Sequence, residues 1–153
     1  MSYVALYRKY RPNNFNDLVG QNAVTSIIKN EILNNKVSHA YIFSGPRGTG
    51  KTSAAKIIAK MVNCHNLSPD GVPCGKCSSC LNFYNSSDVV EIDAASNNGV
   101  DEIRELRDKV NLVPTYGKYK VYIIDEVHML TNQAFNALLK TLEEPPKHII
   151  VIL

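Results

Sequence analysis

The sequence predicts an α/β fold, in which a parallel β-sheet is covered by helices. Four short apolar runs alternate along the chain with four segments whose apolar residues recur at helical spacing. The third and fourth apolar runs are almost continuously hydrophobic, which is typical of parallel strands buried on both faces. Strands that alternate with helices in this way fold into right-handed βαβ units.

The four apolar runs are the predicted strands. They cover residues 40–44, 89–94, 120–125 and 148–153. The last run ends the sequence, and an apolar strand at a free terminus is a poor place to finish a domain. We therefore expect a domain that is incomplete at its C-terminus.

Each predicted helix carries one apolar stripe. The stripes are Val24, Ile27, Ile28 and Ile32; Ala54, Ile57, Ile58, Met61 and Val62; Val100, Ile103, Leu106 and Val110; and Phe135, Leu138, Leu139 and Leu142. Asn98 is the expected N-cap of the third helix, and Thr131 or Asn132 that of the fourth, which Pro145 and Pro146 terminate.

The composition is that of a soluble globular domain. Of 153 residues, 44% are hydrophobic and 20% charged, which excludes general disorder. The net charge of +3 permits contact with nucleic-acid phosphates without requiring it. The first residues lack the apolar segment of a signal peptide, and no apolar run approaches the ~20 residues of a membrane span. We expect a cytoplasmic protein that does not contact a membrane.

The stretch "GPRGTGKT" (45–52) lies between the first strand and the second helical stripe. In this context a G-x-x-x-x-G-K-T pattern predicts a phosphate-binding loop, whose exposed N–H groups and helix N-terminus hold phosphate oxygens. Lys51 is expected to reach the β- and γ-phosphates and Thr52 to bind Mg²⁺. The alternative is an ordinary glycine-rich turn. The candidate nucleotide-binding residues of the loop are Gly45, Pro46, Arg47, Gly48, Thr49, Gly50, Lys51, Thr52 and Ser53.

The third strand runs directly into two carboxylates. In "VYIIDEVH" (121–128), Asp125 is expected at the carboxyl edge of the sheet, where α/β proteins bind ligands. Asp125 is the candidate for holding Mg²⁺, and Glu126 for orienting the attacking water. Acidic residues that merely end a strand are the alternative. His128 is interpreted as a surface or packing residue.

All four cysteines lie in a polar excursion, about residues 63–87, that interrupts the strand–helix pattern. Cys64, Cys74, Cys77 and Cys80 have the spacing C-x9-C-x2-C-x2-C, which predicts a closed, structural Zn²⁺ site. Disulfides are uncommon in the cytosol, and unrelated buried thiols belong on the apolar stripes. His65 in place of one cysteine is a further alternative.

Five segments besides the cysteines point to a known family. They are "YRKYRPNNFNDLVGQ" (7–21), "SGPRGTGKTSAAK" (44–56), "EIDAASNNGVDEIREL" (91–106), "KVYIIDEVHML" (120–130) and "FNALLKTLEEPP" (135–146). In this order they closely resemble the gamma/tau subunits of bacterial DNA polymerase III, which are AAA+ P-loop ATPases of the sliding-clamp loader. The resemblance covers essentially the whole chain, which it identifies as one AAA+ nucleotide-binding domain with the zinc module inserted.

The resemblance implies an ATP-hydrolysing motor that uses ATP/ADP, Mg²⁺ and Zn²⁺. It implies a hetero-pentamer with other clamp-loader subunits that places the sliding clamp on primer-template DNA, within a DNA-directed DNA polymerase complex whose polymerase active site is not in this chain. Arg11, Pro12 and Val19 would form the adenine-side wall, or else belong to a surface arm. Ser96, Asn97 and Asn98 are candidates for DNA contact, with ordinary capping as the alternative, whereas Arg104 and Arg107 are placed on a solvated face.

Three features of the family lie beyond the sequence: the sensor residue, the arginine that acts on a neighbour's ATP, and the helical lid. We therefore expect the isolated fragment to be nearly inactive, since an arginine finger contributes about 10³-fold or more to the rate. Three other functions remain open: a helicase-type motor, a structural loader subunit that does not hydrolyse ATP, and a zinc-dependent interaction module. The intact phosphate loop and acidic pair favour the motor.

Overall fold

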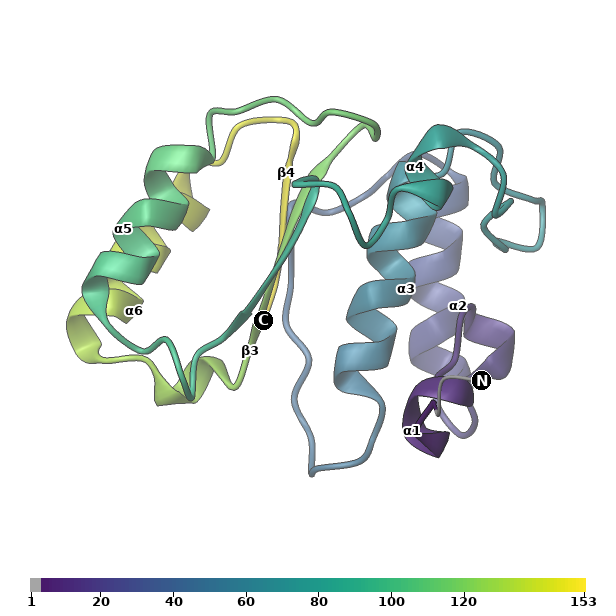
Figure 1. The fold of residues 1–153 in the computed structure, drawn as a ribbon, viewed down its shortest axis with the longest axis horizontal. Coiled ribbons are helices and arrows are strands. Elements are labelled where there is room, and N and C mark those ends of the chain that lie inside the picture. The colour runs from purple at the N-terminus through teal and green to yellow at the C-terminus, as the bar shows by residue number, and fades with distance from the viewer. Residues whose placement is uncertain (1–3) are drawn as a thin grey trace.

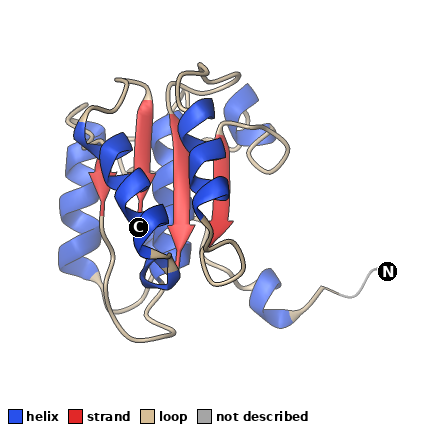
Figure 2. Cartoon of the chain, turned by 90° about the vertical axis from the view of Figure 1, so that its left-hand side faces the viewer, coloured by secondary structure: helices blue, strands red, loops and turns tan. Residues whose placement is uncertain are grey.

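The computed structural model describes residues 4–153 and contains one four-stranded parallel sheet (Figures 1 and 2). Its strands are β1 (Ala40–Tyr41), β2 (Val89–Asp93), β3 (Lys120–Asp125) and β4 (Ile149–Ile152). Their spatial order is β1-β4-β3-β2, and every neighbouring pair is parallel. The predicted α/β class is confirmed.

Helices cover both faces of the sheet, which gives three layers (Figure 1). α2 (Asn22–Leu33) and α3 (Lys51–Asn63) pack on one face, and α5 (Val100–Lys109) and α6 (Asn132–Glu143) on the other. Two short helices lie outside the layers: α1 (Leu6–Lys9) near the N-terminus and α4 (Ser78–Leu81) in the insertion. Short 3-10 turns occupy Phe15–Asp17 and Val127–Met129.

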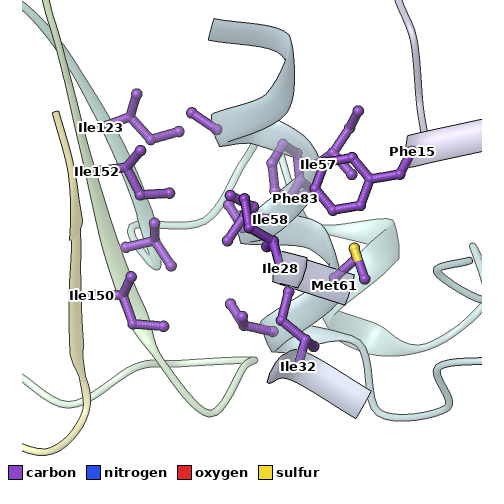
Figure 3. Close-up of a cluster of buried hydrophobic side chains, with 14 residues drawn as sticks. Phe15, Ile28, Ile32, Ile57, Ile58, Met61, Phe83, Ile123, Ile150 and Ile152 are labelled. Carbon is purple, nitrogen blue, oxygen red and sulfur yellow. The ribbon is translucent and has the colours of Figure 1, made fainter. Parts of the chain in front are cut away.

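The central strands separate two hydrophobic clusters because alternate residues of a strand point to opposite faces. Val121 and Ile123 of β3 face α3, whereas Tyr122 and Ile124 face α5 and α6. All four are essentially buried, which explains why this strand is an unbroken apolar run. Figure 3 shows the first cluster, where β3 and β4 meet α2, α3 and Phe15.

The first strand and two helical stripes differ from the prediction. β1 ends at Tyr41 instead of residue 44, although the Phe43 N–H still donates to the Leu153 carbonyl at 2.8 Å. The chain leaves the sheet there to form the loop that precedes α3. Ile27 of α2 is 62% exposed and Phe135 of α6 is 41% exposed, because each helix buries a narrower face than its apolar residues suggest.

The predicted caps are partly correct. The Thr131 hydroxyl accepts the Ala134 N–H at 3.2 Å, as an N-cap should. The N-cap of α5 is Gly99, however, and not Asn98. The Asn98 carbonyl instead accepts the Thr131 N–H at 3.1 Å, and so joins the start of α5 to the start of α6.

Two buried polar side chains fasten the ends of the cysteine-containing insertion to the loop before β3. The Asp88 carboxylate, 2% exposed, accepts the N–H groups of Thr115, Tyr116 and Gly117 at 2.6–2.9 Å. Asn63 exchanges two hydrogen bonds with the backbone of Tyr119, and a Cβ at Gly117 would collide with its side chain. Within residues 4–153, no helix is long and apolar enough to cross a membrane.

Candidate active site and candidate metal centre

The predicted phosphate loop connects β1 to α3, and its backbone conformation depends on glycine. Gly50 is the N-cap of α3 and has a φ of +88°, in the left-handed region that other residues avoid. A Cβ there would also approach Leu18 to 3.3 Å. The loop thus leads directly into the N-terminus of α3, where backbone N–H groups and the helix dipole attract an anion.

The Lys51 side chain folds back over this loop. Its Nζ donates to the carbonyl of Gly45 at 2.5 Å and to that of Pro46 at 3.1 Å. The Thr49 hydroxyl also donates to the Pro46 carbonyl, at 2.9 Å, and so stiffens the turn. An ammonium group held against a glycine-rich loop at a helix N-terminus makes this loop suited to a multiply charged anion.

Thr52 and Asp125 meet where α3 begins and β3 ends. The Thr52 hydroxyl donates to the Asp125 Oδ2 at 2.9 Å, and the Asp125 Oδ1 accepts the Glu126 N–H at 3.0 Å. Both carboxylate oxygens are thus fixed in direction. A hydroxyl and a carboxylate in contact, beside a candidate phosphate loop, are the oxygen donors that Mg²⁺ takes in nucleotide sites.

Glu126 has an unusual backbone conformation. Its φ of 55° and ψ of 43° place it in the left-handed region, which costs a non-glycine residue of the order of 1 kcal/mol. Its carboxylate Oε2 lies 3.2 Å from the Nε2 of His128. His128, which the sequence assigns to the surface, is exposed as expected, but it contacts the candidate water-orienting carboxylate.

The segment before α2 reaches both ends of α3. Leu18 lies against Gly50, whereas its neighbour Val19 is 93% exposed. Arg11 and Pro12 lie farther along α3. There they line a cavity of about 420 Å³, here called the basic cavity, together with Arg8, Lys56, Lys60 and Tyr84. Of the three predicted adenine contacts, Arg11 and Pro12 therefore line one cavity, and Val19 is not among its lining residues.

The four cysteine sulfurs converge. All lie within 4.8 Å of one another, and the Cys74 and Cys80 sulfurs are 3.9 Å apart. A tetrahedral ion with Zn–S bonds of ~2.3 Å separates its sulfurs by roughly 3.8 Å, so this spacing fits a single Zn²⁺. Backbone N–H groups also point at the sulfurs: those of Lys76 and Cys77 donate to Cys74 at 3.4 and 3.3 Å.

These contacts change the acidity of the thiols. Hydrogen bonds from the N–H groups of Lys76 and Cys77 lower the pKa of Cys74 to about 6, so its thiolate form prevails at neutral pH. Burial raises the pKa of Cys80 to about 12. A cation at the centre of the cluster reverses that preference, because it holds all four sulfurs as thiolates.

His65 is engaged outside the cluster. Its Nε2 lies 2.6 Å from the Tyr116 carbonyl, in the loop that Asp88 also holds. Within residues 4–153, the geometry therefore does not support the alternative in which His65 replaces a cysteine as a metal ligand. The residues whose sulfurs could hold a metal ion together are Cys64, Cys74, Cys77 and Cys80.

The side chains of two predicted DNA-contacting residues, Ser96 and Asn97, form hydrogen bonds with the nearby Asp93. The Ser96 hydroxyl donates to the Asp93 carboxylate, and the Asn97 amide to the Asp93 carbonyl, both at 3.2 Å.

The structure also contains a cluster of polar and basic side chains that the sequence analysis did not predict. A hollow of about 340 Å³ between α5 and α6, here called the α5–α6 groove, is lined by Arg104, Arg107, Gln133, Asn136 and Lys140.

The signal for this groove is present in the sequence. Arg104 and Arg107 are one turn apart, and each directly follows a buried residue of the α5 stripe, Ile103 and Leu106. Side chains in that position point beside the helix–helix contact and not away from it. Arg104 and Arg107, which the sequence analysis placed on a solvated face, therefore border this groove.

Comparisons with known proteins agree with this architecture. A family model described as "DNA polymerase III, delta subunit" matches residues 20–153. The chain is 64% identical over its whole length to DNA polymerase III subunit tau of Bacillus subtilis and 48% identical over its whole length to that of Escherichia coli. It is 52% identical over 97% of its length to subunit gamma/tau of Mycobacterium tuberculosis.

The chain covers only 27%, 24% and 26% of these three relatives, respectively. Among solved structures, a DNA polymerase III gamma subunit-related protein from Thermotoga maritima matches 84% of the chain and 38% of its own, with a TM-score of 0.54 and 25% identity. The RuvB Holliday junction branch migration motor of the same organism matches 94% of this chain and 40% of its own, with a TM-score of 0.59 and 19% identity, which shows a shared fold.

Proposed function

Because the chain belongs to the DNA polymerase III subunit family, in which its relatives are gamma and tau subunits, we propose that it is the nucleotide-binding part of an ATP-hydrolysing clamp-loader subunit. Residues 1–153 then form one AAA+ domain with the module at about 63–87 inserted. The motor loads a sliding clamp onto primed DNA in the bacterial cytoplasm. The hydrogen bond between Thr52 and Asp125 is the observation that carries this proposal.

The phosphate loop and the end of β3 divide the work on ATP. The loop from Gly45 to Ser53 holds the phosphates through its N–H groups, and Lys51 moves from the Gly45 and Pro46 carbonyls to the β- and γ-phosphates. Thr52 and Asp125 hold Mg²⁺, which neutralises charge on the phosphates. Arg11, Pro12 and Val19 remain the proposed adenine contacts.

Glu126 is the proposed residue that orients the attacking water. Its carboxylate follows Asp125 directly and is held by His128 at 3.2 Å. A carboxylate accepts the proton of a water that attacks the γ-phosphate, and so aligns the lone pair with phosphorus. The left-handed backbone at Glu126 turns the chain out of the line of β3, directly after Asp125.

Zn²⁺ at the four cysteines has a structural role in this proposal. Four thiolates leave no open coordination position, so the ion fastens the insertion and does no chemistry. The insertion has little core of its own, since Leu81 is exposed and Phe83 is its one large apolar side chain that is well buried. Metal binding, which contributes ~10 kcal/mol in small zinc domains, replaces that core.

The proposed partners are other clamp-loader subunits in a hetero-pentamer, the sliding clamp and primer-template DNA. For the DNA we assign the α5–α6 groove, because Arg104, Arg107 and Lys140 supply three cations and Gln133 and Asn136 two amides. Cations position a phosphate backbone, and side-chain amides donate to its oxygens.

A subunit that binds partners without hydrolysing ATP is the second candidate, because the matching family model is described as a delta subunit. Intact Lys51, Thr52, Asp125 and Glu126 argue against it. The similarity to RuvB concerns the fold and does not favour a helicase-type motor.

The test is the ATPase rate of the complete subunit, assembled with its partners, in the presence and absence of clamp and primed DNA. The proposal expects the rate to rise with both and to be lost in a Lys51→Ala assembly. A rate that clamp and DNA leave unchanged argues against a loader, whereas no turnover in any arm supports the second candidate.

A further inference from the structure

Arg11 and Pro12 of the basic cavity are proposed adenine contacts, whereas Arg8, Lys60 and Tyr84 have no assigned role in the nucleotide site. We propose that the basic cavity binds a short stretch of single-stranded nucleic acid, with backbone phosphates at Arg8 and Lys60 and one base stacked on Tyr84. The cavity measures about 420 Å³. It lies on the α2–α3 face of the sheet, opposite the α5–α6 groove, so a strand bound here is a second and separate contact.

The charge of the cavity favours a polyanion. Arg8, Arg11, Lys56 and Lys60 converge on it from α1, the following segment and α3. Lys56 is paired with Glu91 at 3.1 Å. Within residues 4–153, neither Arg8, Arg11 nor Lys60 forms an ion pair with a carboxylate, so three cations are available to phosphates.

Contacts with three neighbouring side chains hold the Lys60 ammonium in place. It lies 3.2 Å from the Asn13 Oδ1, 5.0 Å from the centre of the Phe83 ring and 5.3 Å from that of Tyr84. These contacts restrict a flexible side chain before any ligand arrives, which lowers the entropy lost on binding. The remaining ammonium hydrogens are free to donate to a phosphate oxygen.

Tyr84 supplies a platform that an acidic peptide would not need. Its ring packs edge-on against the buried Phe83, with centroids 5.0 Å apart and planes at 89°, yet Tyr84 itself is 73% exposed. A supported aromatic ring with an open face beside cations is the arrangement that binds single strands by base stacking, without sequence preference. The bases of a duplex are stacked on one another and cannot use it.

The experiment measures binding of a fluorescein-labelled oligodeoxythymidylate to the complete subunit, without nucleotide, by fluorescence anisotropy. It is done in an Arg104→Gln/Lys140→Gln background, so that the α5–α6 groove does not mask the result. In that background Tyr84→Leu is expected to weaken binding about tenfold, and Tyr84→Phe to leave it within about twofold. Arg8→Gln should reduce the slope of log affinity against log salt by about 0.7.

A strand carrying 5-iododeoxyuridine should also crosslink to the peptide that contains Tyr84 under ultraviolet light. Unchanged affinity in both Tyr84→Leu and Arg8→Gln, or crosslinks confined to α5 and α6, would overturn the proposal. So would equal displacement of the strand by oligoglutamate of the same charge, which indicates an acidic peptide as the ligand. Because ATP is absent throughout, failure here leaves the proposed ATPase function untouched.

Discussion

The hydroxyl of Thr52 donates a hydrogen bond of 2.9 Å to the carboxylate of Asp125, although the two residues are 73 positions apart in the chain. The contact joins the first turn of α3 to the last residue of β3. A glycine-rich turn of no chemical consequence does not require a hydroxyl and a carboxylate to meet at the carboxyl edge of the sheet. The contact places both proposed Mg²⁺ ligands beside Lys51.

Lys51→Ala should abolish turnover by the assembled complete subunit. The Lys51 ammonium donates to two carbonyls of the loop. Its removal leaves the negative charge of the β- and γ-phosphates without a neutralising cation. We expect the ATPase rate to fall at least about a hundredfold. Lys36→Ala, on an exposed loop, is the matched control, and equal rates for both variants would contradict the assignment.

Glu126→Gln should separate nucleotide binding from hydrolysis. The amide keeps the size of the side chain but does not accept a proton, so ATP binds while the rate falls about 10²–10⁴-fold. Nucleotide affinity by equilibrium dialysis and the single-turnover rate measure the two effects. Turnover at the wild-type rate would show that another group orients the water.

The isolated 153-residue chain should hydrolyse ATP negligibly. The isolated chain has no neighbouring subunit, and an arginine supplied by a neighbour contributes about 10³-fold or more to the rate. A steady rate from the purified fragment that Lys51→Ala abolishes would refute this prediction.

Zinc retention should depend on pH through the Cys74 thiol. Its pKa is lowered to about 6, below the ordinary thiol value of about 8.5, so the thiolate contributes stability above the ordinary pKa. That contribution is lost as the pH falls through about 6. Zinc released to a colorimetric chelator is expected to rise over this range, and Cys74→Ser should release zinc at neutral pH. Release that is independent of pH between 8 and 5 would contradict the role of the thiolate.

Tyr122→Phe should stabilise the fold. The Tyr122 hydroxyl is buried without a hydrogen-bond partner among the described residues, and burial raises the pKa of Tyr122. Removing an unsatisfied buried hydroxyl spares its desolvation, which favours folding by about 1 kcal/mol. Thermal unfolding should shift upward by about 3 °C. A lower unfolding temperature would indicate that the hydroxyl has a partner in solution.

The sequence predicts the sheet well because its central strands are buried on both faces. β3 is found at residues 120–125 as expected, and its unbroken apolar run leaves no other interpretation. The end of β1 is less predictable. This edge strand stops pairing at Tyr41, although the apolar composition of the chain continues beyond it. The Cys74–Cys77–Cys80 spacing likewise predicts the convergence of the sulfurs, since short loops constrain where they point.

Contacts between distant segments could not be predicted in the same way. The pairing of Asp88 with residues 115–117 joins segments that are 27 to 29 positions apart, and no local sequence pattern indicates it. The basic cavity is assembled from α1, α3 and the residue after Phe83, so it exists only once the insertion has packed. Exposed apolar residues such as Ile27 and Phe135 were assigned to the core because helical spacing alone does not give the width of the buried face.

The most direct measurement of the central claim is the affinity of the complete subunit for ATP, in excess Mg²⁺ and in excess EDTA, for the wild type, Thr52→Val and Asp125→Asn. If Thr52 and Asp125 hold Mg²⁺ against phosphates gathered by Lys51, Mg²⁺ tightens binding by the wild type and has little effect on either variant. Equal enhancement by Mg²⁺ in all three proteins would show that the metal binds elsewhere, and the contact at 2.9 Å would then have only a structural meaning.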